Sequence, residues 1–216
     1  RFIHLRTHSE YSLLEGAMRL KKLPNLVRDA GMPAIALTDT NNMFAALEFS
    51  VGMADAGVQP IIGCQVDLQY VAPRPGERPR APAPVVLLAQ SEAGYENLMK
   101  LNSCLYLREG SELPFVTVEE LAGHSSGVIC LTGGPAGPVG VLLQNGQRPA
   151  AEALIGRLAE IFGDRLYVEL QRHPGEGGLP EAERLSERGL IEMAYAMGVP
   201  LVATNDVYFP KPDMYE

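Results

Sequence analysis

Short apolar runs alternate with longer stretches of helical spacing along most of the chain. The apolar runs are rich in Val, Ile and Leu and predict buried strands at 2–5, 33–39, 59–70, 85–89, 127–134, 165–170 and 200–206. Apolar positions three and four residues apart predict helices at 20–30, 43–56, 91–107, 149–162 and 179–197, and a short one starting at 117. The alternation indicates an α/β fold.

Helices between successive strands are typical of parallel βαβ units, and both an open doubly wound sheet and a closed barrel fit this pattern. Polar or small residues stand at or just past the ends of the predicted strands: His8, Asp39, Gln65, Gly133, Gln171 and Asp206. In a barrel these strand ends converge on one mouth, whereas in an open sheet they spread along an edge. We therefore favour a seven-stranded β/α barrel, a single domain over residues 1–216.

Composition narrows the class of protein. The chain has 216 residues, of which 46% are hydrophobic and 20% charged, a typical globular profile. No apolar run is long enough for a membrane span and no secretory signal pattern is present, so we expect a cytoplasmic protein without a membrane role. Three widely spaced cysteines (Cys64, Cys104, Cys130) argue against a disulfide framework or a zinc knuckle.

The charge distribution bears on nucleic acid binding. The formal net charge is -8, and only Lys21–Lys22 and the segment 74–80 cluster basic residues. Residues 72–84 hold five prolines and three arginines, which predicts an irregular solvated loop. A surface that follows phosphates needs many clustered Lys and Arg side chains. We therefore expect this chain alone to bind DNA poorly.

Four polar residues form a candidate metal site. His8, Glu15, Asp39 and Asp206 offer the nitrogen and oxygen ligands that divalent metals use, and such a set at a barrel mouth suits metal-assisted phosphoester hydrolysis. The competing interpretation is that Asp39 and Asp206 cap helices or order loops after their strands. Spacing alone leaves both open. The sequence lacks the phosphate-binding GxxxxGK[ST] and GxGxxG motifs and the GxSxG motif of serine hydrolases.

Five segments in order and spacing carry a family resemblance: HLRTHSEYSLLEG, ALTDTNNMFAALEF, PIIGCQ, LLAQSEAGYENLMKL and LVATNDVYF. Together they resemble the N-terminal polymerase-and-histidinol-phosphatase (PHP) domain of bacterial DNA polymerase III alpha subunits. The resemblance implies a distorted seven-stranded β/α barrel. It also implies that residues 1–216 are the N-terminal fragment of a longer polymerase chain, with the last elements of the domain missing.

The resemblance also implies that most metal ligands of the superfamily are replaced. Arg6 stands where metal-binding members have the first His, Thr40 and Tyr208 stand in place of two others, Gln65 replaces a Glu, and a further His falls near Pro84. His173 is interpreted as an exposed loop histidine. The residues of this vestigial site are Arg6, His8, Glu15, Asp39, Thr40, Gln65, Asp206 and Tyr208.

Arginine cannot coordinate a cation, because it is always protonated and has no lone pair to offer. We therefore hypothesise that Arg6 replaces the charge of the ion and forms charge-assisted hydrogen bonds with Glu15 or Asp206. Without such a partner the clustered carboxylates would repel one another.

These substitutions predict a catalytically inactive structural domain that docks a partner. The resemblance implies as partners the remainder of the polymerase chain and the proofreading exonuclease subunit, with DNA reached only through the parent chain. The parent would carry out DNA-templated synthesis with Mg²⁺, while we expect no cofactor in this fragment beyond a weakly held residual divalent ion. The alternative is an active metal-dependent phosphoesterase, such as a 3′-5′ exonuclease or a pyrophosphatase.

Overall fold

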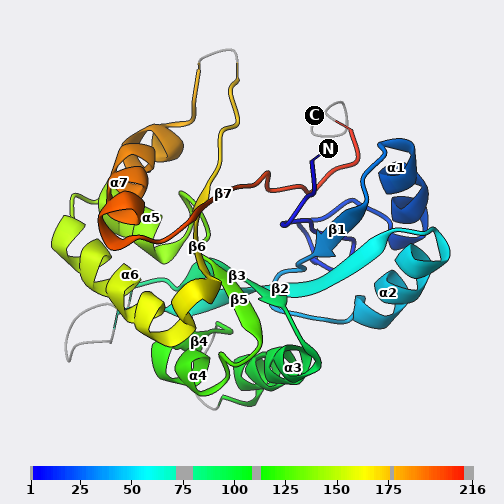
Figure 1. Cartoon of the computed structure of the whole chain (residues 1–216), viewed down its shortest axis with the longest axis horizontal. Helices are drawn as coiled ribbons and strands as arrows, with labels where there is room; N and C mark the ends of the chain where they lie inside the picture. The colour runs from blue at the N-terminus through cyan, green and yellow to red at the C-terminus, as the bar shows by residue number, and fades with distance from the viewer. Residues whose placement is uncertain (1, 72–79, 109–112, 176–177, 212–216) are drawn as a thin grey trace.

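One curled sheet with helices on its outer face makes up the protein (Figure 1). The structure, a computed structural model, describes residues 2–71, 80–108, 113–175 and 178–211. The strands are β1 (Ala34–Leu37), β2 (Gln59–Gln69), β3 (Ala83–Ala89), β4 (Val116–Thr117), β5 (Val128–Leu131), β6 (Leu166–Leu170) and β7 (Leu201–Ala203). The helices are α1 (Leu23–Asp29), α2 (Ala46–Asp55), α3 (Glu92–Leu107), α4 (Val118–Gly123), α5 (Pro138–Gln144), α6 (Arg148–Phe162) and α7 (Glu181–Met197). Two 3-10 turns, η1 (Leu20–Lys22) and η2 (Gly163–Arg165), lie beside α1 and α6.

The strand order is β1-β2-β3-β5-β6-β7, with the short β4 paired to β2. Neighbouring strands run parallel except at β3, which is antiparallel to both β2 and β5. The predicted parallel βαβ pattern therefore does not include this strand, which follows a connection predicted as a loop and not as a helix. An antiparallel pair needs no crossover helix, so β3 can follow β2 through the Pro- and Arg-rich connection. Residues 72–79 of that predicted loop lie outside the described residues, and its last two residues already belong to β3.

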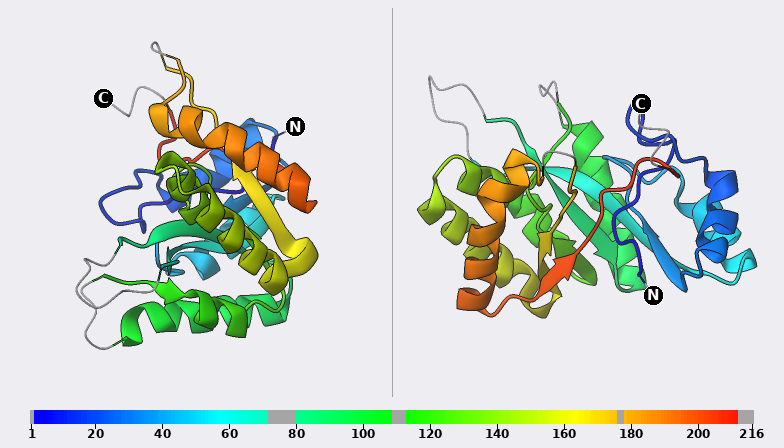
Figure 2. Two further views of the ribbon diagram at one scale, coloured as in Figure 1. Left: turned by 90° about the vertical axis from the view of Figure 1, so that its left-hand side faces the viewer. Right: turned by 90° about the horizontal axis from the view of Figure 1, so that it is seen from above.

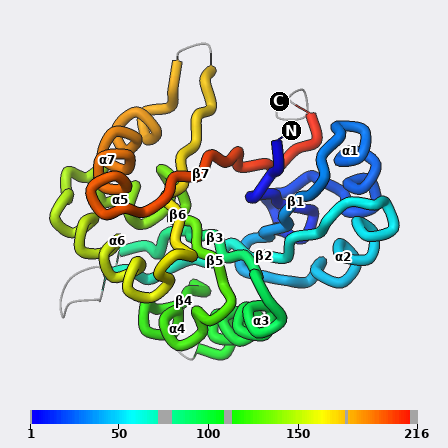
Figure 3. The backbone as a smooth tube through the Cα atoms, in the orientation of Figure 1, coloured from blue at the N-terminus to red at the C-terminus, as the bar shows by residue number. Residues whose placement is uncertain are grey.

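The N-terminal segment closes the sheet between β7 and β1. The backbone amides of Ala36 and Thr38 donate to the carbonyls of His4 and Thr7, at 2.8 and 2.9 Å. On the other side, the amide of His8 donates to the carbonyl of Val207 at 2.8 Å. The predicted strand at 2–5 therefore lacks regular strand geometry, yet its backbone fills the position of a strand. The result is a distorted β/α barrel, and the tube in Figure 3 shows the first and last described segments of the chain side by side at this seam.

Alternate residues of β3 face two different apolar clusters, one outside the barrel and one inside it. Val85 and Leu87 point outward into the large apolar core beneath α3 to α7, whereas Val86 and Leu88 point into the barrel. The inner apolar cluster is small and consists of Ala36, Val86, Leu88 and Leu131. A separate outer core packs α1 and α2 against β1. Because the inner cluster is small, polar side chains occupy the rest of the barrel interior at one end.

Two elements were not predicted from the sequence, and several bounds differ. α5 is short and buried on most sides, so it shows no amphipathic period, and β4 has only two residues. α2 begins at Ala46 instead of residue 43, because residues 40–45 form the turn that carries part of the site. Figure 2 shows the helices arranged around the outside of the sheet. In the described part of the chain, no helix has the length and apolarity that a bilayer span requires.

Candidate functional site

Polar side chains from five parts of the chain meet at one mouth of the barrel. They come from the N-terminal segment, from the turn after β1, from β2, from the end of β6 and from the segment after β7. The strand pairing explains the convergence. Gln65 pairs with Val86 on the neighbouring strand, and Glu169 is two residues after Tyr167 on β6. Paired residues, and residues two apart on one strand, point to the same side of a sheet, so Gln65 and Glu169 face the barrel interior together with the small apolar cluster.

Arg6 occupies the centre of this mouth with a side chain that is only 1% exposed. Its Nε and Nη2 donate to Oε1 of Gln65 at 3.1 and 2.6 Å. Its Nε also lies 3.1 Å from Oδ1 of Asp206, and its Nη1 lies 3.5 Å from Oε1 of Glu169. The carbonyl of Gly133 accepts from Nη1 at 3.4 Å. A buried guanidinium thus lies between two carboxylates and an amide oxygen.

Of the two partners predicted for Arg6, Asp206 lies at ion-pair distance, without the predicted hydrogen bond, and Glu15 is wrong. Oε2 of Glu15 instead accepts a hydrogen bond of 2.7 Å from the hydroxyl of Thr40. Glu15 is exposed at the rim of the mouth, so it does not reach the buried guanidinium.

Sequence reasoning missed Glu169, which is fully buried. Its Oε1 accepts from the hydroxyl of Thr204 and from Nε2 of Gln171, the latter at 3.1 Å. The signal was present as a single charged residue inside the apolar strand LYVEL. A carboxylate at such a position needs a buried partner, and Arg6 supplies it.

His8 links Asp206 to the opposite wall of the mouth. Its Nε2 lies 3.0 Å from Oδ1 of Asp206, and its Nδ1 lies 3.2 Å from the hydroxyl of Ser12. The imidazole stacks on the ring of Tyr208, with centroids 4.2 Å apart and planes 7° from parallel. Burial alone would raise the pKa of Asp206, but the polar contact with His8 and the charge of Arg6 lower it below its ordinary value.

Asp39 orders a turn instead of holding out a free carboxylate. Its Oδ1 accepts from the amide of Ser9 at 2.6 Å and from the hydroxyl of Ser12 at 2.7 Å. Its Oδ2 accepts from the hydroxyl of Ser9 at 2.8 Å. The N-cap of α2 is Ala45, so Asp39 is not a helix cap, and its role matches the loop-ordering interpretation.

Tyr208 and His173 complete the surroundings of Asp206. Burial, followed by the negative charge of Asp206, raises the pKa of the Tyr208 hydroxyl. His173 is a half-exposed loop histidine as predicted, and its Nδ1 lies 2.6 Å from Oε1 of the buried Glu183 on α7. Its charge contributes to the lowered pKa of Asp206.

The arrangement does not fit a divalent metal. Arg6 places a positive charge where an ion would be needed, and three donors already occupy the oxygens of Asp39. Nε2 of His8, Oδ1 of Asp206 and Oε2 of Glu169 are buried without a hydrogen-bond partner among the described residues, but Nε of Arg6 lies 3.1 Å from that Asp206 oxygen, so a cation there would meet the guanidinium. Over the same residues, no group of three or more His, Cys, Asp or Glu side chains is placed to hold an ion.

Comparison with known proteins gives a matching family and sequence relatives that share one name. The PHP domain family profile matches residues 4–173. The chain is 49% identical to DNA polymerase III subunit alpha of Caulobacter vibrioides, over 100% of this chain and 18% of that protein. It is 39% identical to the protein of the same name from Treponema pallidum, over 98% of this chain and 18% of the relative. The chain thus spans less than a fifth of the length of these relatives.

Solved structures share the fold at low sequence identity. An amidohydrolase from Chromobacterium violaceum, with bound sulfate and no metal, superposes with a TM-score of 0.59 at 14% identity. That match covers 98% of this chain and 89% of the other. A two-domain protein from Bacteroides vulgatus that contains a predicted PHP-like metal-dependent phosphoesterase superposes with a TM-score of 0.56 at 14% identity, over 96% of this chain and 52% of that one.

Proposed function

This chain belongs to the PHP domain family, and we propose that it is the amino-terminal domain of a bacterial DNA polymerase III alpha subunit, with a metal site that has become a structural ion-pair cluster. The observation that carries the proposal is the buried guanidinium of Arg6 between Asp206 and Glu169. A fixed positive charge there neutralises the carboxylates that an ion would otherwise neutralise. The cluster joins the N-terminal segment to β2, β6 and the segment after β7, which suits a scaffold.

The parent chain would carry out DNA-templated DNA synthesis. Nucleotidyl transfer with Mg²⁺ needs acidic residues that would lie in the part of the relatives beyond this alignment, since the alignment covers 18% of the Caulobacter protein. This domain would contribute no catalytic group. With a net charge of -8 it would meet DNA only as part of the parent chain.

Partner docking would be the second task of the domain. The remainder of the polymerase chain and the proofreading exonuclease subunit are the proposed partners. Exposed large apolar side chains such as Phe44, Leu47 and Tyr106 support a protein-binding role, because monomeric proteins rarely gather such residues on one face.

The test of the vestigial site compares metal content with activity. The purified chain is analysed for bound zinc, manganese and iron, its melting temperature is measured with and without these ions, and hydrolysis of p-nitrophenyl phosphate and of a 3′-labelled single-stranded oligonucleotide is assayed. We expect less than stoichiometric metal, no shift in melting temperature and no hydrolysis above a buffer control.

Arg6→His serves as the second arm of this test. It restores one imidazole while Thr40, Gln65 and Tyr208 still stand in place of ligands, so we expect no gain of hydrolysis. A stoichiometric tightly bound ion with phosphoester turnover in the unmodified chain would instead establish the active phosphoesterase. Turnover appearing in Arg6→His alone would show that the replaced ligands are dispensable and would refute the vestigial site.

A further inference from the structure

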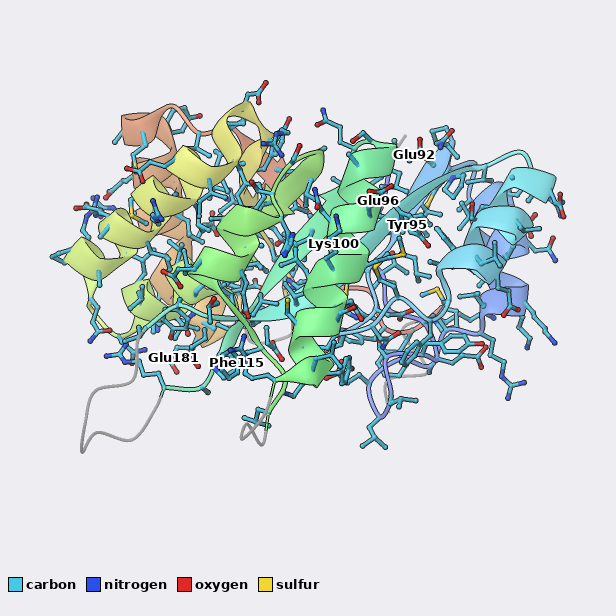
Figure 4. All side chains as sticks on the ribbon, turned by 90° about the horizontal axis from the view of Figure 1, so that it is seen from below. Glu92, Tyr95, Glu96, Lys100, Phe115 and Glu181 are labelled. Carbon is cyan, nitrogen blue, oxygen red and sulfur yellow. The ribbon has the colours of Figure 1, made fainter. Side chains whose placement is uncertain are left out.

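We propose that the groove between α2 and α3 docks an apolar segment flanked by Lys or Arg, presented by a protein other than this chain. The inference rests on the proposed docking function and adds the surface and the chemistry of the partner. Figure 4 looks onto this side of the molecule, where α3 and α2 lie apart with β2 between them.

The groove is a cavity of about 410 Å³ with mainly apolar walls. Met43 and Phe44 line it from the turn before α2, and Met99, Tyr106 and Leu107 line it from α3. Phe44, Tyr106 and Leu107 are 68%, 59% and 79% exposed. Such large exposed side chains gathered around one hollow are the usual form of a protein-docking surface.

The apolar surface extends along α2. Leu47 and Val51 are exposed and stand four residues apart, so they lie on one edge of the helix. The opposite edge faces α1, since the position of a Cβ on Gly52 lies 3.5 Å from the ring of Pro24. Leu47 and Val51 therefore lie on the edge directed away from α1, which Figure 1 shows to be the side toward α3.

The sheet topology explains why the groove exists. Ile62 of β2 packs into the core under α2, whereas the thiol of Cys64, two residues on, accepts from Nδ2 of Asn102 on α3 at 3.3 Å. The two helices thus divide the outer face of one strand. Because β3 returns antiparallel to β2, the described part of the chain places no helix of a βαβ unit between them.

The charged residues beside the groove indicate which kind of segment can bind in it. Glu92 and Glu96 precede Met99 and Ser103 at spacings of four, three and four, so all four lie along one stripe of α3. Figure 4 shows Glu92, Tyr95, Glu96 and Lys100 along this exposed part of the helix. Exposed Glu48 lies beside Leu47 on α2, so three carboxylates against the one ammonium group of Lys100 leave the surface net acidic. An apolar segment with flanking Lys or Arg complements this surface, whereas a second copy of this chain would oppose acid to acid.

The vestigial site supports one wall of the groove. The hydroxyl of Tyr106 donates to the carbonyl of Asn41 at 2.8 Å, and the amide of Phe44 donates to Oδ1 of Asn42 at 3.2 Å. Nδ2 of Asn42 in turn donates to the carbonyl of Tyr11 at 2.9 Å. Asn41 and Asn42 directly follow Thr40, which donates to Glu15 at the rim of the mouth, so the turn that leads out of the mouth also positions Phe44.

The experiment uses photocrosslinking in the intact polymerase chain within its host cells. A benzophenone amino acid is placed at Leu47, or at the exposed Tyr195 of α7 as a control, and adducts are identified by mass spectrometry. We expect one major adduct from position 47, formed on an apolar segment with flanking Lys or Arg in a different protein, and none of it from position 195. An adduct on a second copy, an adduct on the polymerase chain itself, or no specific adduct would each overturn the proposal.

Substitutions then measure separately how much the acidic and the apolar side chains contribute to binding, with the crosslinker kept at position 47. Glu92→Lys combined with Glu96→Lys is expected to lower the adduct yield about threefold or more, while Glu181→Lys on α7 leaves it unchanged. Phe44→Ser is expected to lower it about tenfold or more. Equal yields for Glu92→Lys/Glu96→Lys and for Glu181→Lys would overturn the charge argument and with it the stated chemistry of the partner.

Failure of this inference is distinguishable from failure of the proposed function. If the exonuclease subunit copurifies with the polymerase but forms its adducts at other positions, docking stands and the groove is wrong. If the exonuclease subunit does not bind at all and the position 47 adduct forms on another basic, apolar segment, the groove stands and the proposed partner is wrong.

Discussion

Arg6 and Asp206 connect the first and last parts of the described chain, with 3.1 Å between Nε and Oδ1 and the arginine side chain buried. Two hundred residues separate them in the sequence, so the contact closes the barrel where β7 and β1 do not pair. A divalent ion could join these segments only by coordinating ligands from each. The guanidinium joins them by an ion pair, is held in place by its hydrogen bonds to Gln65 and Gly133, and needs no free ion in solution.

Replacing Arg6 by Ala should lower the free energy of unfolding by about 3–5 kcal/mol. The reason is that Glu169, fully buried, and Asp206 would then face each other without a cation. Urea unfolding followed by circular dichroism measures the change. Arg28→Ala is the matched control, because Arg28 is exposed and lies 3.9 Å from the exposed Asp29, and we expect a change of about 0–1 kcal/mol. Equal losses for the two variants would contradict a structural role of the buried cluster.

Acid should weaken the fold partly through Asp206. Its pKa in the folded protein lies below the ordinary value of 3.8, so the folded state binds this proton less tightly than the unfolded chain. The stabilisation by Asp206 is therefore complete above pH 3.8 and is lost as the pH falls through the lowered folded value. Asp206→Asn should cost on the order of 3 kcal/mol at pH 7.

The measurement is the difference in unfolding free energy between the unmodified chain and Asp206→Asn at several pH values. We expect the difference to be constant between pH 5 and 7 and to shrink below about pH 4. Asp164→Asn, at an exposed position beside β6, should show a small difference that does not vary with pH. A difference for Asp206→Asn that stays constant down to pH 2 would show that the carboxylate is not stabilised by its neighbours.

The sequence predicts the convergence of the site because strand ends are visible as the limits of apolar runs. His8, Asp39 and Asp206 follow such runs, and the structure brings them to one mouth together with Gln65, which lies within β2 and not at its end. The pairing of Arg6 with Asp206 also follows from residue chemistry, since a buried guanidinium needs a carboxylate. That the eight residues descend from a metal site stays a prediction that the metal assays above address.

Other features depend on contacts that no local pattern reveals. Glu169 was missed because alternation along an isolated strand does not say which side faces the barrel interior. Glu15 was proposed as a partner of Arg6 because the family resemblance places both in the former metal site, yet the turn ordered by Asp39 carries it to the rim, where Thr40 donates to it. The reversal of β3 has the same origin, because strand direction depends on the connection and not on the residues of the strand.

Stacking between His8 and Tyr208 should be separable from the polar contact of the tyrosine hydroxyl. Tyr208→Ala removes the ring that lies 4.2 Å from the imidazole, and we expect a loss of about 2–3 kcal/mol in unfolding free energy. Tyr208→Phe keeps the ring and removes only a hydrogen bond of 3.4 Å to Asp206, so it should cost less than about 1 kcal/mol. A loss in Tyr208→Phe as large as in Tyr208→Ala would assign the stabilisation to the hydroxyl instead of the ring.

Gly133 should tolerate no side chain, because its backbone has two constraints at once. Its φ angle is +80°, and an added Cβ would lie 2.0 Å from the carbonyl oxygen of Pro84. Its own carbonyl accepts from Arg6, so a shift of the turn would also disturb the ion-pair cluster. We expect Gly133→Ala to be less stable than the unmodified chain by more than about 3 kcal/mol.

Gly146→Ala is the control, since Gly146 has a φ of +68° with open space around it and should show only the backbone cost of about 1 kcal/mol. Thermal and urea unfolding of both variants measure the difference between them. Similar losses would mean that the turn at Gly133 relaxes away from Pro84, and that the position of the Gly133 carbonyl is not fixed by close packing.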